Sequence, residues 1–84
     1  MPRFYLNLYT GSGETIDEEG QQAADLEAAR ERALIEIRSL LAEEVRGGSL
    51  NLAGRIEVAD QTGAVLAIVP FRDAVALASG EAVT

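Results

Sequence analysis

The chain has 84 residues and a formal net charge of −7, because seven basic residues stand against fourteen acidic ones. All the basic residues are arginine, and the sequence contains no histidine, lysine or cysteine. These absences exclude an imidazole base, a thiolate nucleophile, a Schiff-base lysine and an ordinary zinc site. We expect one small domain, whose single core leaves a thin margin of stability that oligomerisation would widen.

Charge and composition also indicate partners and location. A net charge of −7 repels nucleic-acid phosphate and anionic lipid, and it suits a basic protein. The longest strongly apolar run, residues 64–71, is far shorter than the ~20 residues of a membrane helix. Residues 1–4 show no signal-peptide pattern, and the lack of cysteine fits a reducing cytoplasm. We therefore expect a cytoplasmic protein that binds neither nucleic acid nor membrane.

The N-terminal part of the chain predicts a hairpin. Residues 3–9 alternate between two faces, as a strand does, and residues 10–13 contain the two glycines of a tight turn. Residues 14–16 predict a short returning strand, which the acidic residues 17–20 break or bend. Residues 21–24 carry little signal.

A long helix is predicted over residues 26–46. Apolar residues recur there at three- and four-residue steps and form one stripe. Asp25 is the expected N-cap, and Gly47 and Gly48 end the helix. The stripe consists of Leu26, Ala29, Ala33, Ile37, Leu40, Leu41 and Val45.

The C-terminal part predicts a second hairpin. Residues 54–59 alternate as a third strand, residues 60–63 form a turn that ends in glycine, and residues 64–71 form a fourth strand that is apolar on both faces. Residues 72–78 can add a turn or two of helix. Residues 79–84 are expected to be a flexible tail.

These elements predict an α+β domain over residues 1–78, with the order β-β-α-β-β. One long helix lies across one face of a four-stranded sheet and leaves the other face open. The first and fourth strands are apolar on both faces, so we expect them at the centre of the sheet. This gives a β-grasp-like strand order of 2-1-4-3, and 2-1-3-4 is the alternative.

The open face of the sheet is the predicted functional site. It contains alternate residues of the first strand, namely Tyr5, Asn7 and Tyr9. Beside them lie either Leu66 and Ile68 or Val65 and Val69. Tyrosine on an uncovered apolar face is a good interface anchor. We therefore predict a homodimer whose contact uses Tyr5, Asn7 and Tyr9.

No catalytic, cofactor-binding or metal-binding residue is predicted. The Gly-Ser-Gly stretch at 11–13 lacks the Gly-Lys-Ser/Thr of a phosphate loop, so a hairpin turn explains it better. The acidic stretch at 17–19 lacks the ligand spacing of an EF-hand and is expected to be a solvated turn. The hydroxyl nucleophiles have no histidine or lysine to activate them. The protein is therefore not expected to be an enzyme.

Two hypotheses for function follow from the residues. The first is a non-enzymatic domain that acts through protein–protein contact, by self-association of the open sheet face. The alternative is a module that binds a small anionic ligand, with Arg55 or Arg72 holding the ligand at the edge of the sheet.

Several motifs also occur in an order that resembles a known family. They are MPRFY at 1–5, DEEG at 17–20, DLEAAR at 25–30, GRIEV at 54–58 and VPF at 69–71. Over residues 1–77 the chain is similar to a family of short, mainly alphaproteobacterial proteins of unknown function, whose members often have histidine in place of Asn7. The resemblance implies the architecture, but it implies no activity, cofactor or catalytic residue.

A more local resemblance covers residues 3–45. A hairpin, an acidic stretch and a helix that opens Asp-Leu-Glu-Ala-Ala are similar to the N-terminal part of HicB-type antitoxins. This resemblance implies a further hypothesis, in which the acidic surface binds a small basic protein.

Overall fold

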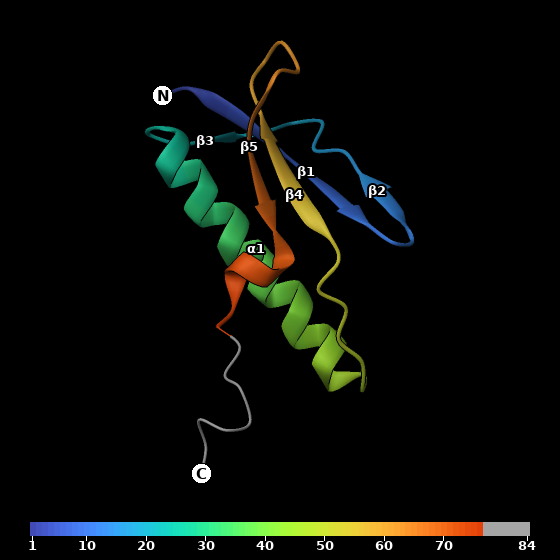
Figure 1. Cartoon of the computed structure of the whole chain (residues 1–84). Coiled ribbons are helices and arrows are strands. Elements are labelled where there is room, and N and C mark those ends of the chain that lie inside the picture. The colour runs from blue at the N-terminus through green and yellow to red at the C-terminus, as the bar shows by residue number, and fades with distance from the viewer. Residues whose placement is uncertain (77–84) are drawn as a thin grey trace.

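The computed structural model describes residues 1–76, which form one sheet and one long helix (Figure 1). The elements are β1 (Arg3–Thr10), β2 (Gly13–Thr15), β3 (Gln21–Gln22), α1 (Leu26–Arg46), β4 (Arg55–Ala59), β5 (Val65–Pro70) and the 3-10 helix η1 (Phe71–Ala74). The predicted α+β class is confirmed. The expected end of the domain at residue 78 and the tail at 79–84 lie outside the described residues.

β1 organises the N-terminal half of the sheet. β2 pairs antiparallel with its C-terminal end, where Thr15 lies opposite Leu8, and β3 pairs with its N-terminal end, where Gln21 lies opposite Phe4. The returning chain is therefore interrupted by residues 16–20. β3 was not predicted, because two glutamines carry no periodicity of their own and pair only where β1 offers a ladder.

α1 has the predicted bounds, and local chemistry explains both ends. Asp25 is the N-cap, and its Oδ1 accepts a hydrogen bond of 2.8 Å from the backbone N–H of Ala28. At the other end Gly48 has a φ of +94°, which glycine adopts readily and other residues avoid. The amide of Gly47 donates to Glu43 O, so the last turn closes on its own carbonyls.

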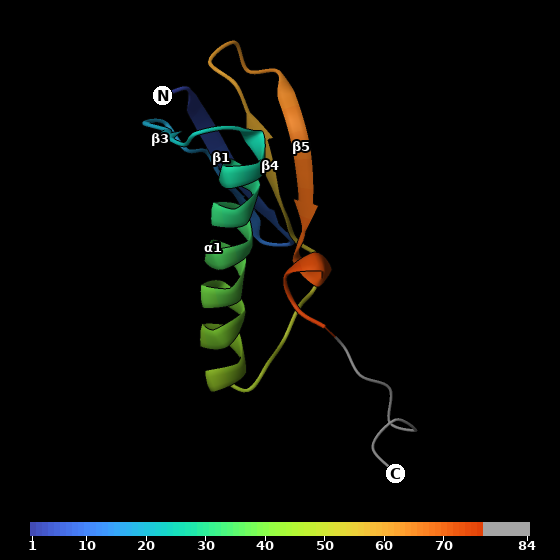
Figure 2. The same ribbon diagram turned by 90° about the vertical axis from the view of Figure 1, so that its left-hand side faces the viewer.

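The core lies between α1 and one face of the sheet. Figure 2 shows the sheet edge-on, with α1 along this face. The largest fully buried side chains are Ile37 of α1 and Ile56, Val58 and Val69 of the sheet. Burial of each stabilises the fold by ~1.5–3 kcal/mol. Small residues of α1, including the fully buried Ala33, allow the helix to approach the strands closely.

The order of the strands is β2-β1-β4-β5, which is the alternative 2-1-3-4. The β-grasp-like order 2-1-4-3 is wrong, because β4 lies at the centre and the apolar β5 lies at the edge. The alternation of polar and apolar residues in β4 reflects two different faces rather than an edge position. Its Arg55 and Glu57 form an ion pair, Nε to Oε2, at 2.8 Å. Each balances the charge of the other, so β4 can carry both while it pairs with β1.

Gly54 explains how β4 enters beside β1. A Cβ at this position would lie 2.9 Å from the carbonyl oxygen of Tyr9 and 2.6 Å from the ring of Phe71. Only glycine avoids both contacts, and its carbonyl accepts the N–H of Phe71 at 2.9 Å. The start of β4 and the end of β5 are therefore fastened together at one point.

The structure also decides which side of β5 faces the helix. Val69 is fully buried in the core, so Leu66 and Ile68 rather than Val69 accompany the open face. Val65 lies opposite Ala59 and is exposed on this face as well. Ala59 pairs with Val65 whereas Val58 pairs with Ala67, so β5 contains a bulge at Leu66. After β5, the helical turn expected over 72–78 is η1 as far as the structure describes it.

Candidate functional site

The predicted interface residues of β1 lie on the open face, but their side chains already make contacts within the chain. Tyr5, Asn7 and Tyr9 are all half-buried. The Oδ1 of Asn7 accepts the backbone N–H of Asp17 at 2.9 Å. The ring of Tyr5 lies against Gly20, where a Cβ would come within 2.8 Å of it. This part of the face is therefore partly occupied by residues 16–20.

A charged pair lies on the open face at the start of β4. The guanidinium of Arg55 lies 4.5 Å from the centre of the Tyr9 ring and also pairs with Glu57. Such a cation–π contact is worth ~0.5–1 kcal/mol at an exposed site. Arg55 is thus held in place by two partners, and its charge is largely balanced by Glu57.

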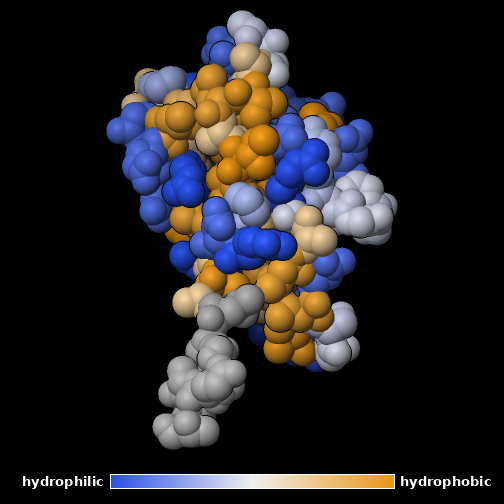
Figure 3. Space-filling model, in the orientation of Figure 1, coloured by the Kyte–Doolittle hydropathy of each residue, from blue (hydrophilic) through white to orange (hydrophobic). Residues whose placement is uncertain are grey.

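The outer surface of β5 is apolar and exposed. Ile68 is 55% exposed, Val65 is 50% exposed and Leu66 is 43% exposed. The strand Val65–Pro70 contains no charged residue. In Figure 3 this strand coincides with the hydrophobic area in the upper part of the molecule, which hydrophilic residues surround. We call Val65, Leu66 and Ile68 the β5 patch.

A second group of exposed aliphatic residues lies near the C-terminal end of α1. Val45, Leu50 and Val75 line a hollow of about 500 Å³ there. Val75 directly precedes Ala76, the last described residue.

The interruption between β2 and β3 is built around Asp17. One carboxylate oxygen, Oδ2, accepts the backbone N–H of Leu6 at 3.2 Å, and the other, Oδ1, accepts the N–H of Gly20 at 3.0 Å. These bonds replace ladder bonds that a continuous strand would have made. Asp17 is therefore a structural residue, although the sequence predicted only a solvated acidic turn at this place.

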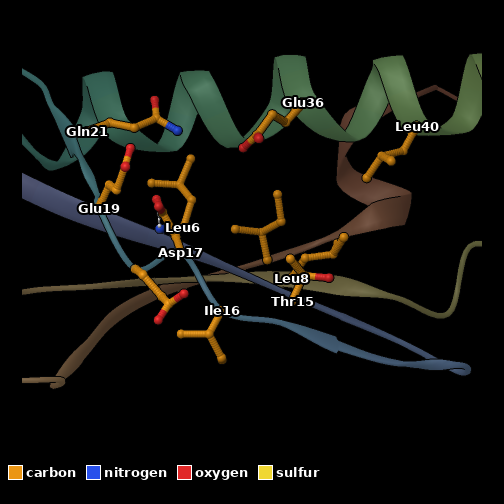
Figure 4. Close-up of a pocket in the computed structure, with 11 residues that line it drawn as sticks. Leu6, Leu8, Thr15, Ile16, Asp17, Glu19, Gln21, Glu36 and Leu40 are labelled. Atoms are coloured by element: carbon orange, nitrogen blue, oxygen red, sulfur yellow. Dashed lines mark hydrogen bonds between the residues drawn. The ribbon is translucent and has the colours of Figure 1, made fainter.

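An acidic cleft lies between this interruption and α1 (Figure 4). Its volume is about 430 Å³, and Leu6, Leu8 and Ile56 contribute its apolar lining. Four carboxylates also line it, from Asp17, Glu18, Glu19 and Glu36. Figure 4 shows Glu36 and Leu40 reaching from α1 towards the sheet.

Glu36 is the titratable group that the acidic cleft perturbs. Partial burial raises the pKa of its carboxyl above the usual value, and the negative charge of Asp17 raises it further. Within residues 1–76, no group of three or more acidic side chains is arranged to hold a metal ion. The cleft therefore presents a negative potential over an apolar floor, without the geometry of a metal centre.

Asp60 is perturbed in the opposite direction at the turn before β5. The hydroxyl of Thr62 donates to its Oδ1 at 2.6 Å, and the amides of Thr62 and Ala64 donate to the same oxygen. The side-chain bond from Thr62 is the largest cause that holds the pKa of Asp60 below its usual value. The turn thus keeps an ionised carboxylate beside the start of β5.

Sequence reasoning named the open face correctly but missed two features. The position of β5 at the edge of the sheet exposes Leu66 and Ile68, and no local pattern distinguishes such an edge strand from a central one. The second feature is Asp17, whose bonds to Leu6 and Gly20 depend on chain segments that meet only in the fold. The signal present was the pair Asp17 and Gly20, since aspartate accepts backbone bonds in turns and glycine tolerates a φ of +73°.

Comparison with known proteins gives one result. A family model described as "Domain of unknown function (DUF6894)" matches residues 3–72. Neither the curated proteins nor the solved structures contain a match. In the part of the chain that the structure describes, no helix is long and apolar enough to cross a membrane.

Proposed function

The chain belongs to this DUF6894 family of domains of unknown function, and from its surfaces we propose that it is a non-enzymatic protein that acts through protein–protein contact, by associating with a second copy of itself. The contact uses the open side of the sheet and is centred on the β5 patch. Tyr5, Asn7 and Tyr9 flank this centre on β1, two strands away, or ~10 Å.

The observation that carries this proposal is the exposure of the β5 patch. Its three aliphatic side chains are each between 43% and 55% exposed on a chain that carries a net charge of −7. Contiguous apolar surface on a small soluble protein commonly marks an interaction site. An uncharged strand on an otherwise charged surface is also the pattern of an interface core surrounded by a polar rim.

A second copy fits this surface better than an anionic ligand does. Arg55, one of the two arginines considered for such a ligand, is already engaged by Glu57 and Tyr9. Self-association also adds buried apolar area to a chain whose core is small. Covering the β5 patch with a second copy would therefore form the contact and also stabilise the fold of each copy.

The test is the mass in solution, measured by size exclusion with light scattering over a hundredfold range of concentration. We expect a dimer of about twice 8.9 kDa at the upper end of the range. Ile68→Glu is expected to shift the protein towards the monomer, because it places a charge at the contact. The dissociation constant of the dimer should rise at least ~10-fold. The two introduced carboxylates, one on each copy, would repel each other across the contact.

Ile35→Glu is the matched control, because Ile35 is 58% exposed on α1 and lies away from the sheet face. This variant should dimerise as the wild type does. A wild-type protein that stays monomeric throughout the range would refute the proposal. Equal weakening by Ile35→Glu and Ile68→Glu would show that the β5 patch is not the contact.

A further inference from the structure

The outer edge of β5 is uncovered in the described part of the chain. β5 pairs with β4 on one side, and it is the last strand on its side of the sheet. Figure 2 looks towards this edge and shows β5 along its whole length, with α1 beside it rather than over it. Among residues 1–76 nothing pairs with this side of the strand, which there presents backbone groups in addition to its exposed side chains.

The hydrogen-bond pattern indicates which backbone groups face outwards. Phe71 donates its N–H to the carbonyl of Gly54, so Phe71 faces β4. In an antiparallel ladder, consecutive residues face alternate sides, so Val69 and Ala67 also face β4. The N–H and C=O of Ile68 therefore face the free edge. Pro70 faces the same way, where its missing N–H costs the ladder with β4 nothing.

Proteins prevent edge strands from pairing with other chains by charge, proline or a bulge; this edge has the proline and the bulge but no charged side chain. Such protection usually comes from charged side chains on the edge strand, and β5 has none between Val65 and Pro70. Pro70 and the bulge at Leu66 limit the length of pairing but leave Ile68 accessible between them. An edge that is exposed, apolar and uncharged is suited to a partner strand of the same kind.

We propose that two copies of this chain pair antiparallel through the edges of their β5 strands, about a two-fold axis near Ile68, so that the two sheets join into one. This inference rests on the proposed self-association and specifies its geometry: the β5 patches of the two copies become neighbours across the joined edges, and Tyr5, Asn7 and Tyr9 lie outside the contact. An antiparallel pair of identical strands is self-complementary, as a two-fold contact requires. Outward-facing residues must oppose outward-facing residues, so the axis passes beside Ala67 or Ile68. Either register places Leu66 and Ile68 of one copy against aliphatic side chains of β5 in the other.

Charges of both signs lie at the ends of β5. Antiparallel pairing brings the chain that follows one β5 towards the turn that precedes the other. Arg72 follows the strand and is exposed, and Asp60 belongs to the preceding turn, where Thr62 and Ala64 hold its carboxylate. The exposed Asp73 beside Arg72 balances its charge, so the two ends of the contact supply no net attraction, and the strand between them carries no charge that repels its copy.

Amide hydrogen exchange tests this geometry on the wild-type protein, measured by NMR at concentrations well below and well above the dimer midpoint. The N–H of Ile68 should exchange rapidly in the monomer, because it faces solvent. It should exchange at least ~10-fold more slowly in the dimer, where a carbonyl of the other copy accepts it. The N–H of Val69 is the internal control, since β4 protects it in both states.

The outcomes separate the geometry from the proposed function. A dimer with a protected Ile68 amide supports edge pairing. A dimer whose Ile68 amide exchanges as fast as in the monomer overturns edge pairing and leaves self-association through the sheet face in place. A protein that is monomeric at every concentration overturns both.

Discussion

Asp17 holds the interruption between β2 and β3, residues 16–20, against β1. Its two carboxylate oxygens accept the amides of Leu6 and Gly20, and its own amide donates to Asn7. Charged acceptors make stronger bonds to amides than neutral ones do. Residues 17–20 are thus fastened to β1 through one aspartate.

Removal of the Asp17 carboxylate should destabilise the fold. Asp17→Ala leaves two partly buried amides without their acceptor, so we expect the free energy of unfolding to fall by ~2–3 kcal/mol. Urea denaturation followed by circular dichroism measures this change. The neighbouring Glu18 is exposed, and Glu18→Ala should change stability by no more than ~0.5 kcal/mol. Equal effects of the two variants would contradict the structural role of Asp17.

Glu36 gives stability a specific dependence on pH. Its folded-state pKa is raised by burial and by Asp17, so the folded protein binds this proton more tightly than the unfolded chain does. The contribution of Glu36 to stability therefore falls as pH rises above the ordinary pKa of 4.5. Glu36→Gln should remove this loss and raise stability at pH 7 by up to ~0.5 kcal/mol, since the carboxyl is only partly buried and its charge is screened by solvent.

Thermal unfolding of the Glu36→Gln variant at several pH values measures this difference. The gain should be present at neutral pH and vanish in acid, where the glutamate of the wild type is protonated in both states. A gain that is larger at pH 3 than at pH 7 would mean that the sign of the shift is wrong.

At the scale of elements, the position of β4 depends on Gly54. Gly54→Ala places a Cβ against the Phe71 ring and the Tyr9 carbonyl, at 2.6 and 2.9 Å. We expect a loss of ~1–3 kcal/mol, the usual cost of overpacking, measured by urea denaturation. Gly11→Ala is the matched control, because a Cβ there meets nothing within 4 Å. If both variants unfold alike, the close fit at Gly54 does not determine how β4 enters the sheet.

The helix and the strands differed in how far local sequence predicted them. α1 was predicted with its observed bounds, because its apolar spacing, its Asp25 cap and its terminal glycines are all local signals. The pairing of β4 with β1 was only the alternative, because strand order depends on contacts between distant segments. Polar alternation in β4 was misleading, since the Arg55–Glu57 pair allows a central strand to carry charge on its open face.

At the scale of the whole molecule, net charge opposes self-association. Each copy carries −7, so two copies repel at long range. Added salt screens this repulsion, and exposed ion pairs such as one between Arg72 and Asp60 contribute little in comparison. The dissociation constant of the dimer should therefore fall several-fold between ~50 and ~500 mM NaCl.

Sedimentation equilibrium over this range of salt measures the effect. A dissociation constant that rises with salt would mean that ion pairs, rather than the apolar β5 patch, hold the copies together. A constant that does not change would mean that the charges of the two copies lie farther apart than edge pairing of β5 allows.

The sequence by itself determined the composition-based exclusions, the helix, the strands longer than two residues and the open face that contains Tyr5, Asn7 and Tyr9. All of these follow from local periodicity, capping and residue type. The tertiary structure alone decided that β5 is the edge strand, that Asp17 fastens residues 17–20 to β1 and that Leu66 and Ile68 are exposed. These features depend on which segments, distant in the sequence, lie side by side, and an apolar strand has the same local pattern at the centre of a sheet as at its edge.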